Sequence, residues 1–260
     1  MTFDDIKDTA SMRRRARKVY KDNFGKLFLI SLIVTGLGLL LGALTGDFSQ
    51  TKPATSVSLI VALIQFFLLI PLQIGMERCY MKAFKDGDFE FKELIRPFKS
   101  KYWRNLGSNL FVALIAFAIT IIVVPIYFII SLGAGKNILA AFFVIVILCV
   151  FLIIIVVFAC AIFLLDYFLA DEEYDYLSAW EAVSLCMEKS KGFKLSIFGL
   201  ALYYTFIMLL IIFPIALLAM FTLPAIGVFI AYGIEMLVSL LISPLIGMGF
   251  SGFYYRVKSR

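Results

Sequence analysis

The stretch ILAAFFVIVILCVFLIIIVVFACAIFLLDYFLA, residues 138–170, is almost wholly apolar over 33 consecutive positions. A helix of about 20 apolar residues crosses a hydrocarbon core roughly 30 Å thick. At about 1.5 Å per residue, a wholly helical stretch of this length would measure roughly 50 Å. It must therefore either tilt strongly in the bilayer or continue beyond it as a cytoplasmic stalk. Both interpretations place this stretch across a membrane.

Five further stretches have the same apolar character, and the composition of the whole chain agrees with them. Hydrophobic residues make up 62% of the 260 residues, charged residues make up 16%, and the mean hydropathy is +0.99. A soluble domain contains roughly 45–50% apolar and about 25% charged residues, because its surface needs polar cover. We therefore predict an all-α integral membrane protein whose single transmembrane domain, residues 1–260, contains six spans. The other five predicted spans are Leu27–Leu44, Val57–Met76, Leu106–Leu132, Phe193–Phe221 and Ala225–Phe250.

Lysine and arginine are distributed unevenly between the segments that connect these spans. Of the 24 basic residues, 22 lie on one side and only Lys52 and Lys136 lie on the other. Short cytoplasmic loops of membrane proteins carry an excess of Lys and Arg. Both termini are therefore expected in the cytoplasm, together with the loops at 77–105 and 171–192. The 22 comprise eight residues in 1–26, eight in 77–105, three in 171–194 and three in 251–260.

A short pattern occurs three times, with a polar helix, a junction of basic and aromatic residues, and then a span. Its junction aromatics are Phe24, Trp103 and Phe193, and each opens a pair of spans. Two of the pairs also end alike, in Pro-Leu-Gln-Ile-Gly-Met from Pro71 and in Pro-Leu-Ile-Gly-Met from Pro244. We interpret the pattern as three hairpins of spans, each preceded by a cytoplasmic interfacial amphipathic helix, the first within residues 1–26. The alternative is that any span entering from the cytoplasm begins with basic and aromatic anchors.

The cytoplasmic helices have recognisable start and stop signals. Ser178 and Glu181 have the spacing of a capping box, and Gly192 follows at a suitable distance to end that helix. Thr2 and Asp5 begin the N-terminal helix in the same way. The acidic run before the capping box is expected to place negative charge near the start of the following helix, rather than to bind a metal ion. This run consists of Asp171, Glu172, Glu173 and Asp175.

Several motifs at the predicted membrane boundaries occur together in one bacterial family of integral membrane proteins. They are Asn23-Phe24-Gly25-Lys26, Pro71-Leu72 with Gly75, Tyr102-Trp103, Tyr167-Phe168-Leu169-Ala170-Asp171, Ser178-Ala179-Trp180-Glu181-Ala182 and Ser190-Lys191-Gly192. In this combination, which covers nearly the whole chain, the sequence resembles the family catalogued as domain of unknown function 975. The span at 138–170 is longer and more aliphatic than that family's pattern. The resemblance implies a bacterial plasma-membrane location and brings no catalytic residues.

Glu235 is the strongest candidate for a ligand-binding residue, because it lies near the middle of the sixth predicted span. Tyr232 and Ser239 share its helix face, at i−3 and i+4. An ionisable group at that depth costs about 2.5–3.5 kcal/mol, so it should face the interior and be protonated or paired. One hypothesis is a site for a proton, a cation or an amine. The alternative is a neutral acid that is hydrogen-bonded to a neighbouring tyrosine or carbonyl. Gln65, Tyr203 and Tyr204 are expected to line the same cavity.

A dense basic cluster lies in the N-terminal segment, next to the first span. Each charge there could contribute about 1 kcal/mol to binding an anionic lipid headgroup at the cytoplasmic surface. The alternative is that these residues only set the orientation of the first span. Nucleic-acid binding is not expected, because the helix adjoins a span and has no recognisable nucleic-acid-binding fold. The cluster consists of Arg13, Arg14, Arg15, Arg17 and Lys18.

Signatures of catalysis are missing from the sequence. It has no histidine, no Gly-x-Ser-x-Gly motif and no Walker-type loop, and we expected no paired carboxylates within the spans. We therefore predict no enzyme, no metal site and no cofactor. The preferred hypothesis is a membrane-embedded binding or accessory protein that interacts with lipids or peptides, with a protein partner on its cytoplasmic helices. The alternative is a transporter or permease for an amphipathic or cationic molecule. The oligomeric state stays open.

Overall fold

A computed structural model describes residues 9–44, 55–134, 138–222 and 227–259, and it is all-helical, with no strand among these residues. Six of its helical stretches are long and apolar enough to cross a membrane, so the predicted all-α fold with six candidate spans is confirmed. They are consistent with a multi-pass membrane protein. Four of the stretches are single helices: α2 (Phe24–Leu44), α6 (Tyr102–Ala134), α10 (Lys194–Thr222) and α11 (Gly227–Lys258). The fifth is a continuous run of α3 (Thr55–Ile64), η2 (Gln65–Leu69) and α4 (Ile70–Asp86). The sixth consists of α7 (Ile138–Ile162) followed by α8 (Leu165–Ala170).

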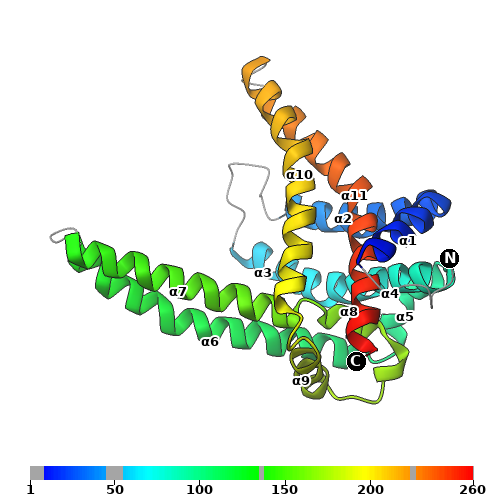
Figure 1. Ribbon diagram of the computed structural model, residues 1–260, viewed down its shortest axis with the longest axis horizontal. Helices are drawn as coiled ribbons and strands as arrows, with labels where there is room; N and C mark the ends of the chain where they lie inside the picture. Colours follow the sequence, from blue (N-terminus) through cyan, green and yellow to red (C-terminus); the bar gives the residue numbers. More distant parts are fainter. Residues whose placement is uncertain (1–8, 45–54, 135–137, 223–226, 260) are drawn as a thin grey trace.

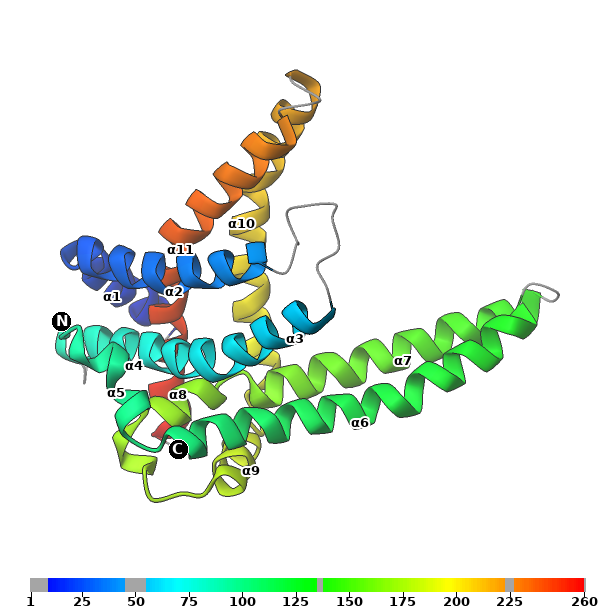
Figure 2. The ribbon, with the colours of Figure 1, turned by 180° about the vertical axis from the view of Figure 1, so that it is seen from behind.

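The long helices lie in three groups that diverge from a common region (Figures 1 and 2). Helix α6 packs along α7, α10 packs along α11, and α2 runs beside the α3–η2–α4 stretch. We call the common region the base and the diverging outer parts of the long helices the arms. The base comprises residues 9–31, 70–109, 160–197 and 243–259. Its shorter helices are α1 (Thr9–Asp22), α5 (Lys92–Lys99), η3 (Glu172–Tyr174) and α9 (Ala179–Lys189).

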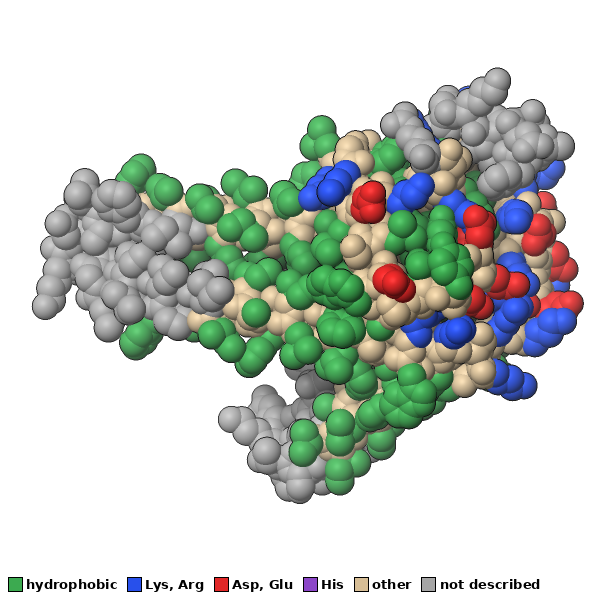
Figure 3. Space-filling model, turned by 90° about the horizontal axis from the view of Figure 1, so that it is seen from below, with side chains coloured by type: hydrophobic (Ala, Val, Ile, Leu, Met, Phe, Trp, Pro, Cys, Tyr) green, Lys and Arg blue, Asp and Glu red, His purple; other side chains and the backbone are tan. Residues whose placement is uncertain are grey.

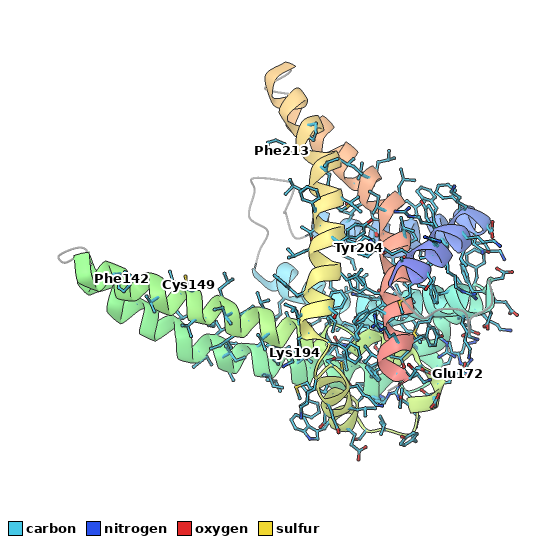
Figure 4. All side chains as sticks on the ribbon, viewed as in Figure 1. Phe142, Cys149, Glu172, Lys194, Tyr204 and Phe213 are labelled. Carbon is cyan, nitrogen blue, oxygen red and sulfur yellow. The ribbon has the colours of Figure 1, made fainter. Side chains whose placement is uncertain are left out.

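Charge and apolar surface are divided between these two regions. In the space-filling view, Lys, Arg, Asp and Glu gather over the base, whereas hydrophobic side chains cover the described surface of the arms (Figure 3). Phe142 and Cys149 of α7, for example, lie on an arm and far from the base (Figure 4). Arms of this kind suit a hydrocarbon solvent, since apolar side chains exposed over such an area are unfavourable in water.

The long apolar stretch at 138–170 is not one continuous helix. Helix α7 ends at Ile162, two residues intervene, and the buried helix α8 follows. The thiol of Cys186 on α9 donates to the carbonyl of Ala161 at this break, at 3.4 Å. Hydropathy could not locate the break, because a segment buried in protein and a segment buried in lipid are equally apolar.

Helices α4 and α11 cross closely in the core of the base. The ring of Tyr80 lies over Gly247, where a Cβ atom would overlap it, and Phe84 similarly packs on Gly252. The hydroxyl of Tyr80 then hydrogen-bonds with the buried Ser31 of α2 at 2.8 Å. A single aromatic side chain thus connects three of the candidate spans, and glycine is what allows its close approach.

The two similar Pro-Leu motifs occupy these crossing helices, and each receives a tyrosine from elsewhere. Pro71 lacks the N–H that would bond to the carbonyl of Phe67, and the hydroxyl of Tyr102 donates to that carbonyl at 3.0 Å. One turn before Pro244, the carbonyl of Leu241 accepts from the hydroxyl of Tyr20 at 2.7 Å. At Pro71 the carbonyl that proline leaves without a helical donor is therefore hydrogen-bonded by protein, and near Pro244 a neighbouring carbonyl receives an additional donor.

The capping box that begins α9 is confirmed. The backbone N–H of Ser178 donates to the carboxylate of Glu181 at 2.8 Å, and the N–H of Glu181 donates to Ser178 Oγ at 3.4 Å. The helix ends at Lys189, and Gly192 beyond it has a φ angle of 83° in the left-handed region. The predicted start of the N-terminal helix at Thr2 lies outside the described residues.

Candidate functional site

A cavity of about 510 Å³ lies where the arms diverge from the base. Helices α4, α6, α8, α10 and α11 all contribute to its walls, together with the end of α7. Lys and Arg are missing from its described lining, whereas two carboxylates are present. The lining residues that the later argument uses are Glu77, Asn109, Asp166, Tyr167, Ser239 and Ser243.

Glu77 of α4 and Asp166 of α8 lie on this cavity, close enough for their charges to interact. Asn109 on α6 lies within hydrogen-bonding range of Asp166. The expectation that no two carboxylates are paired within the spans is therefore wrong. It was wrong because the two residues are 89 positions apart in the sequence, and only the packing of α4 against α8 brings them together.

One oxygen of Glu77 has no protein partner. Oε2 is buried and forms no hydrogen bond with any described residue. Tyr167 lies within hydrogen-bonding range of Glu77, but its hydroxyl also donates to the carbonyl of Gly247 at 3.2 Å. A hydroxyl has one proton and donates to one acceptor at a time. A buried carboxylate in this condition needs a proton or a cation, because an uncompensated charge is costly away from water.

Of the three predicted cavity residues on α11, the structure places one on the cavity and does not describe the side chains of the other two. Ser239 lines the cavity, one turn from Ser243, which lines it as well. The backbone of Tyr232 and Glu235 belongs to α11, but the side chains of these two residues lie outside what the structure describes. Whether Glu235 reaches the cavity therefore stays a prediction.

The other three predicted cavity residues lie elsewhere. Tyr204 is buried on α10, with its ring centroid 5.7 Å from that of Phe250. The guanidinium carbon of Arg13 lies over the ring of Tyr203, 5.0 Å from its centroid. Gln65 begins η2 and does not line the cavity. The prediction placed the cavity near mid-span, whereas the structure places its two carboxylates, on α4 and α8, nearer the span ends that adjoin the charged segments.

The sequence did carry a signal for one of the residues that it missed. Asp166 is the only acidic residue in the predicted span 138–170, so the cost of an ionisable group inside a span singles it out as well, although it lies nearer one end of its span than Glu235 does. Glu77 directly follows Met76, the predicted end of the second span, and was therefore assigned to a loop. The structure continues that helix to Asp86 and so places Glu77 inside it.

The base contains a second charged site, centred on Glu93 of α5. This buried carboxylate accepts from Arg78 Nε at 2.6 Å and from Lys82 Nζ at 2.8 Å. Burial alone would raise the pKa of Glu93, but the hydrogen bonds and charges of Lys82 and Arg78 lower it to about 2. Arg78 is buried as well, so each partner depends on the other for compensation.

The acidic run contributes to the same network, and this differs from its predicted role. Glu172 pairs with Arg78 and with Arg96, the latter at 2.6 Å. Asp171 accepts from Lys258 Nζ at 2.6 Å and from the Tyr254 hydroxyl at 2.7 Å. Burial would raise the pKa of Asp171, but these two hydrogen bonds and that of the Glu173 N–H lower it.

The prediction that the acidic run places charge at the start of the following helix holds for η3, which Asp171 caps, but not for α9. Glu181 serves that helix start, while the run connects α4, α5, α6 and α11 by ion pairs, including Asp175 with Arg104 at 3.3 Å. No group of three or more potential metal-binding side chains occurs in the part of the chain that the structure describes.

The basic cluster of α1 divides into inward and outward members. The side chain of Arg15 donates to the carbonyls of Phe84 and Lys85, each at 2.7 Å. It thus provides hydrogen-bond donors to carbonyls in the last turn of α4, which have no partner within the helix. Arg14, Arg17 and Lys18 are exposed. Only part of the predicted lipid-headgroup cluster is thus presented to the surroundings.

Comparisons with known proteins add no functional assignment to this geometry. The function must therefore be inferred from the cavity, the charged base and the apolar arms. No family model matches the chain, and neither a curated protein nor a solved structure matches it.

Proposed function

We propose that this protein is a membrane-embedded binding protein for an amphipathic cation, which it holds in the cavity between α4, α6, α8, α10 and α11. The observation that carries the proposal is the buried Oε2 atom of Glu77, which forms no hydrogen bond with any described residue, in a cavity that also contains Asp166. An ammonium or similar cationic group bound there would compensate both carboxylates. Such charge-assisted hydrogen bonds are among the stronger ones in proteins.

The remaining walls suit the hydrocarbon part of such a ligand. Val112, Ile162, Phe163, Met208 and Phe250 provide apolar surface around the two carboxylates. The cavity volume of about 510 Å³ falls within the range of about 300–1,000 Å³ that is usual for sites of small organic molecules. An anionic ligand would instead meet two carboxyl groups and no described basic residue.

The proposed orientation places the charged outer part of the base, with both chain termini, in the cytoplasm, and the arms in the bilayer as three hairpins. The excess of Lys and Arg in the segments of the base supports this orientation. The resemblance to domain of unknown function 975 supports a bacterial plasma membrane. In this orientation Arg14, Arg17 and Lys18 lie at the anionic leaflet surface, and α5 and α9 are available to a protein partner. We propose a binding or accessory role rather than an enzymatic one.

A permease is the second candidate. The observation that favours it is the position of the cavity between three helix groups that diverge, since transporters often bind substrate between units that rock against each other. Binding and transport are separable, because a binding protein retains its ligand without carrying it across the bilayer.

Two ions of almost the same shape and opposite charge provide the test. The full chain in lipid nanodiscs would be titrated with tetraphenylphosphonium and with tetraphenylborate, and binding measured by equilibrium dialysis. We expect preferential binding of the cation, and a loss of at least about tenfold in affinity in the Glu77→Gln/Asp166→Asn variant. The matched control Asp22→Asn/Glu90→Gln changes the net charge equally at exposed positions.

Equal binding of the phosphonium ion by the cavity variant and the wild type would refute the proposal. Uptake of tetraphenylphosphonium into proteoliposomes, abolished by the same variant, would favour the permease. Binding without uptake would favour the accessory role.

A further inference from the structure

A second hollow, of about 590 Å³, lies between α6, α7, α9 and the start of α10. We call it the lysine groove. Its two ends differ sharply in chemistry. One end is formed by Ile119, Ile153, Ile154, Val157 and Phe158 of the α6 and α7 arms. The other end is polar and lies at the base, where it is formed by Ser184, Glu188, Lys191 and Lys194.

The apolar end is open to the surroundings. Ile153, Ile154 and Val157 are all exposed, and Ile153 retains 61% of its accessible surface. These residues lie on α7 within a stretch that is apolar enough to cross a membrane. The groove therefore runs from a surface that suits acyl chains to the level at which lipid headgroups lie.

The polar end offers positive charge that the protein itself does not use. No ion pair of Lys191 or Lys194 is found among the described residues. Lys194 is the first residue of α10, beside the origin of the α6–α7 arm (Figure 4). The free N–H groups of that helix start add to the attraction for an anion. Glu188 is the one acidic side chain of the groove.

We propose that the lysine groove binds an anionic phospholipid with a hydroxyl-bearing headgroup, of the phosphatidylglycerol type. Lys191 and Lys194 contact the phosphate, and one acyl chain lies along Ile153, Ile154 and Val157. Glu188 accepts a hydrogen bond from a headgroup hydroxyl. A choline headgroup has no donor for Glu188 and neutralises the phosphate charge, so phosphatidylcholine fits less well. This site is separate from the carboxylate cavity and does not depend on its proposed ligand.

Native mass spectrometry of the full chain in a mild detergent tests the proposal. The protein would be titrated with phosphatidylglycerol and with phosphatidylcholine of identical acyl chains, and the bound lipids counted. We expect the wild type to prefer phosphatidylglycerol. The Lys191→Gln/Lys194→Gln variant should bind phosphatidylglycerol about twenty-five-fold more weakly, because each lysine contributes about fivefold. Its binding of phosphatidylcholine should be unchanged.

Two further variants separate the groove from general surface charge. Lys92→Gln/Lys99→Gln removes the same charge from α5, outside the groove, and should leave the preference unchanged. Val157→Trp fills the apolar end and should weaken both lipids. The proposal is overturned if the groove double variant retains wild-type binding of phosphatidylglycerol, or if the wild type binds phosphatidylcholine equally well.

Discussion

The base and the arms of this protein are stabilised in different ways. In the base, Arg78, Glu93 and Glu172 form a network of ion pairs, and side chains such as Tyr80 and Tyr254 are fully enclosed by protein. On the arms, large apolar side chains such as Leu152 remain 61% exposed. The comparison teaches that specific contacts hold the base together, whereas the arms depend on the solvent that surrounds them.

This difference also explains where the polar chemistry is located. Ion pairs in the base are formed on the side that the proposed orientation places toward water, where the cost of desolvating a charge is shared with many partners. The carboxylate cavity lies between the two regions. Polar side chains still occur there, but few of them can pair with a carboxylate. An incompletely paired residue such as Glu77 is the expected result of that position.

The largest effect is expected from breaking the centre of the base. Glu93→Gln removes the charge that compensates the buried Arg78, and we expect the free energy of unfolding to fall by about 3–5 kcal/mol. Unfolding would be followed by circular dichroism during titration of detergent-solubilised protein with dodecyl sulfate. The control Glu90→Gln breaks only an exposed pair with Lys92 and should change stability by about 0.5 kcal/mol or less. Similar losses in both variants would contradict this account of the base.

Acidification should weaken the same network by about 3 kcal/mol. The pKa of Glu93 is about 2 in the folded protein, against 4.5 for an ordinary glutamate. Because the folded pKa is the lower one, its contribution is complete above pH 4.5 and is lost as the pH falls toward 2. The difference in thermal midpoint between wild type and Glu93→Gln should therefore shrink across that interval. A constant difference would show that the charge of Glu93 is not what stabilises the base.

A moderate effect is expected where α4 crosses α11. In Gly247→Ala the new Cβ overlaps the buried ring of Tyr80, and overpacking of this kind costs about 1–3 kcal/mol. Gly199→Ala on α10 is the matched control, because its Cβ would meet no neighbouring atom. That change should be neutral, or stabilising by about 0.4–1 kcal/mol. Equal responses to the two substitutions, measured in the same dodecyl sulfate titration, would contradict a tight crossing.

The smallest effect is expected on an arm. Leu152→Ala shortens a side chain that projects from α7, and in lipid nanodiscs we expect a change of no more than about 0.5 kcal/mol. Leu164→Ala, at the buried break before α8, should cost about 2–5 kcal/mol. Thermal unfolding of both variants in nanodiscs would make the comparison. A large loss for Leu152→Ala would mean that protein, rather than lipid, covers this arm.

The arms could be predicted from the sequence, because their stability depends on local properties. The apolar length of the segment around Leu152 and the local spacing of Ser178 and Glu181 require no knowledge of the fold. The base could not be predicted in the same way. The ion pair of Arg78 with Glu172 joins residues 94 positions apart, and from the sequence the partner of Arg78 could have been any carboxylate of the charged segments. Asp166 illustrates the intermediate case. The sequence predicted that it lies inside a span, but it did not predict that Glu77 is its neighbour.

The hydrogen bond from Tyr20 to Leu241 has a consequence for how the protein is made. It joins residues 221 positions apart, between helix α1 and helix α11, which is synthesised later. At about 5–20 residues per second, α1 must wait roughly 10–45 s for its partner to be synthesised. The base therefore closes only after α11 has been synthesised. A chain cut short before α11 would insert its arms but leave α1 without its docking surface.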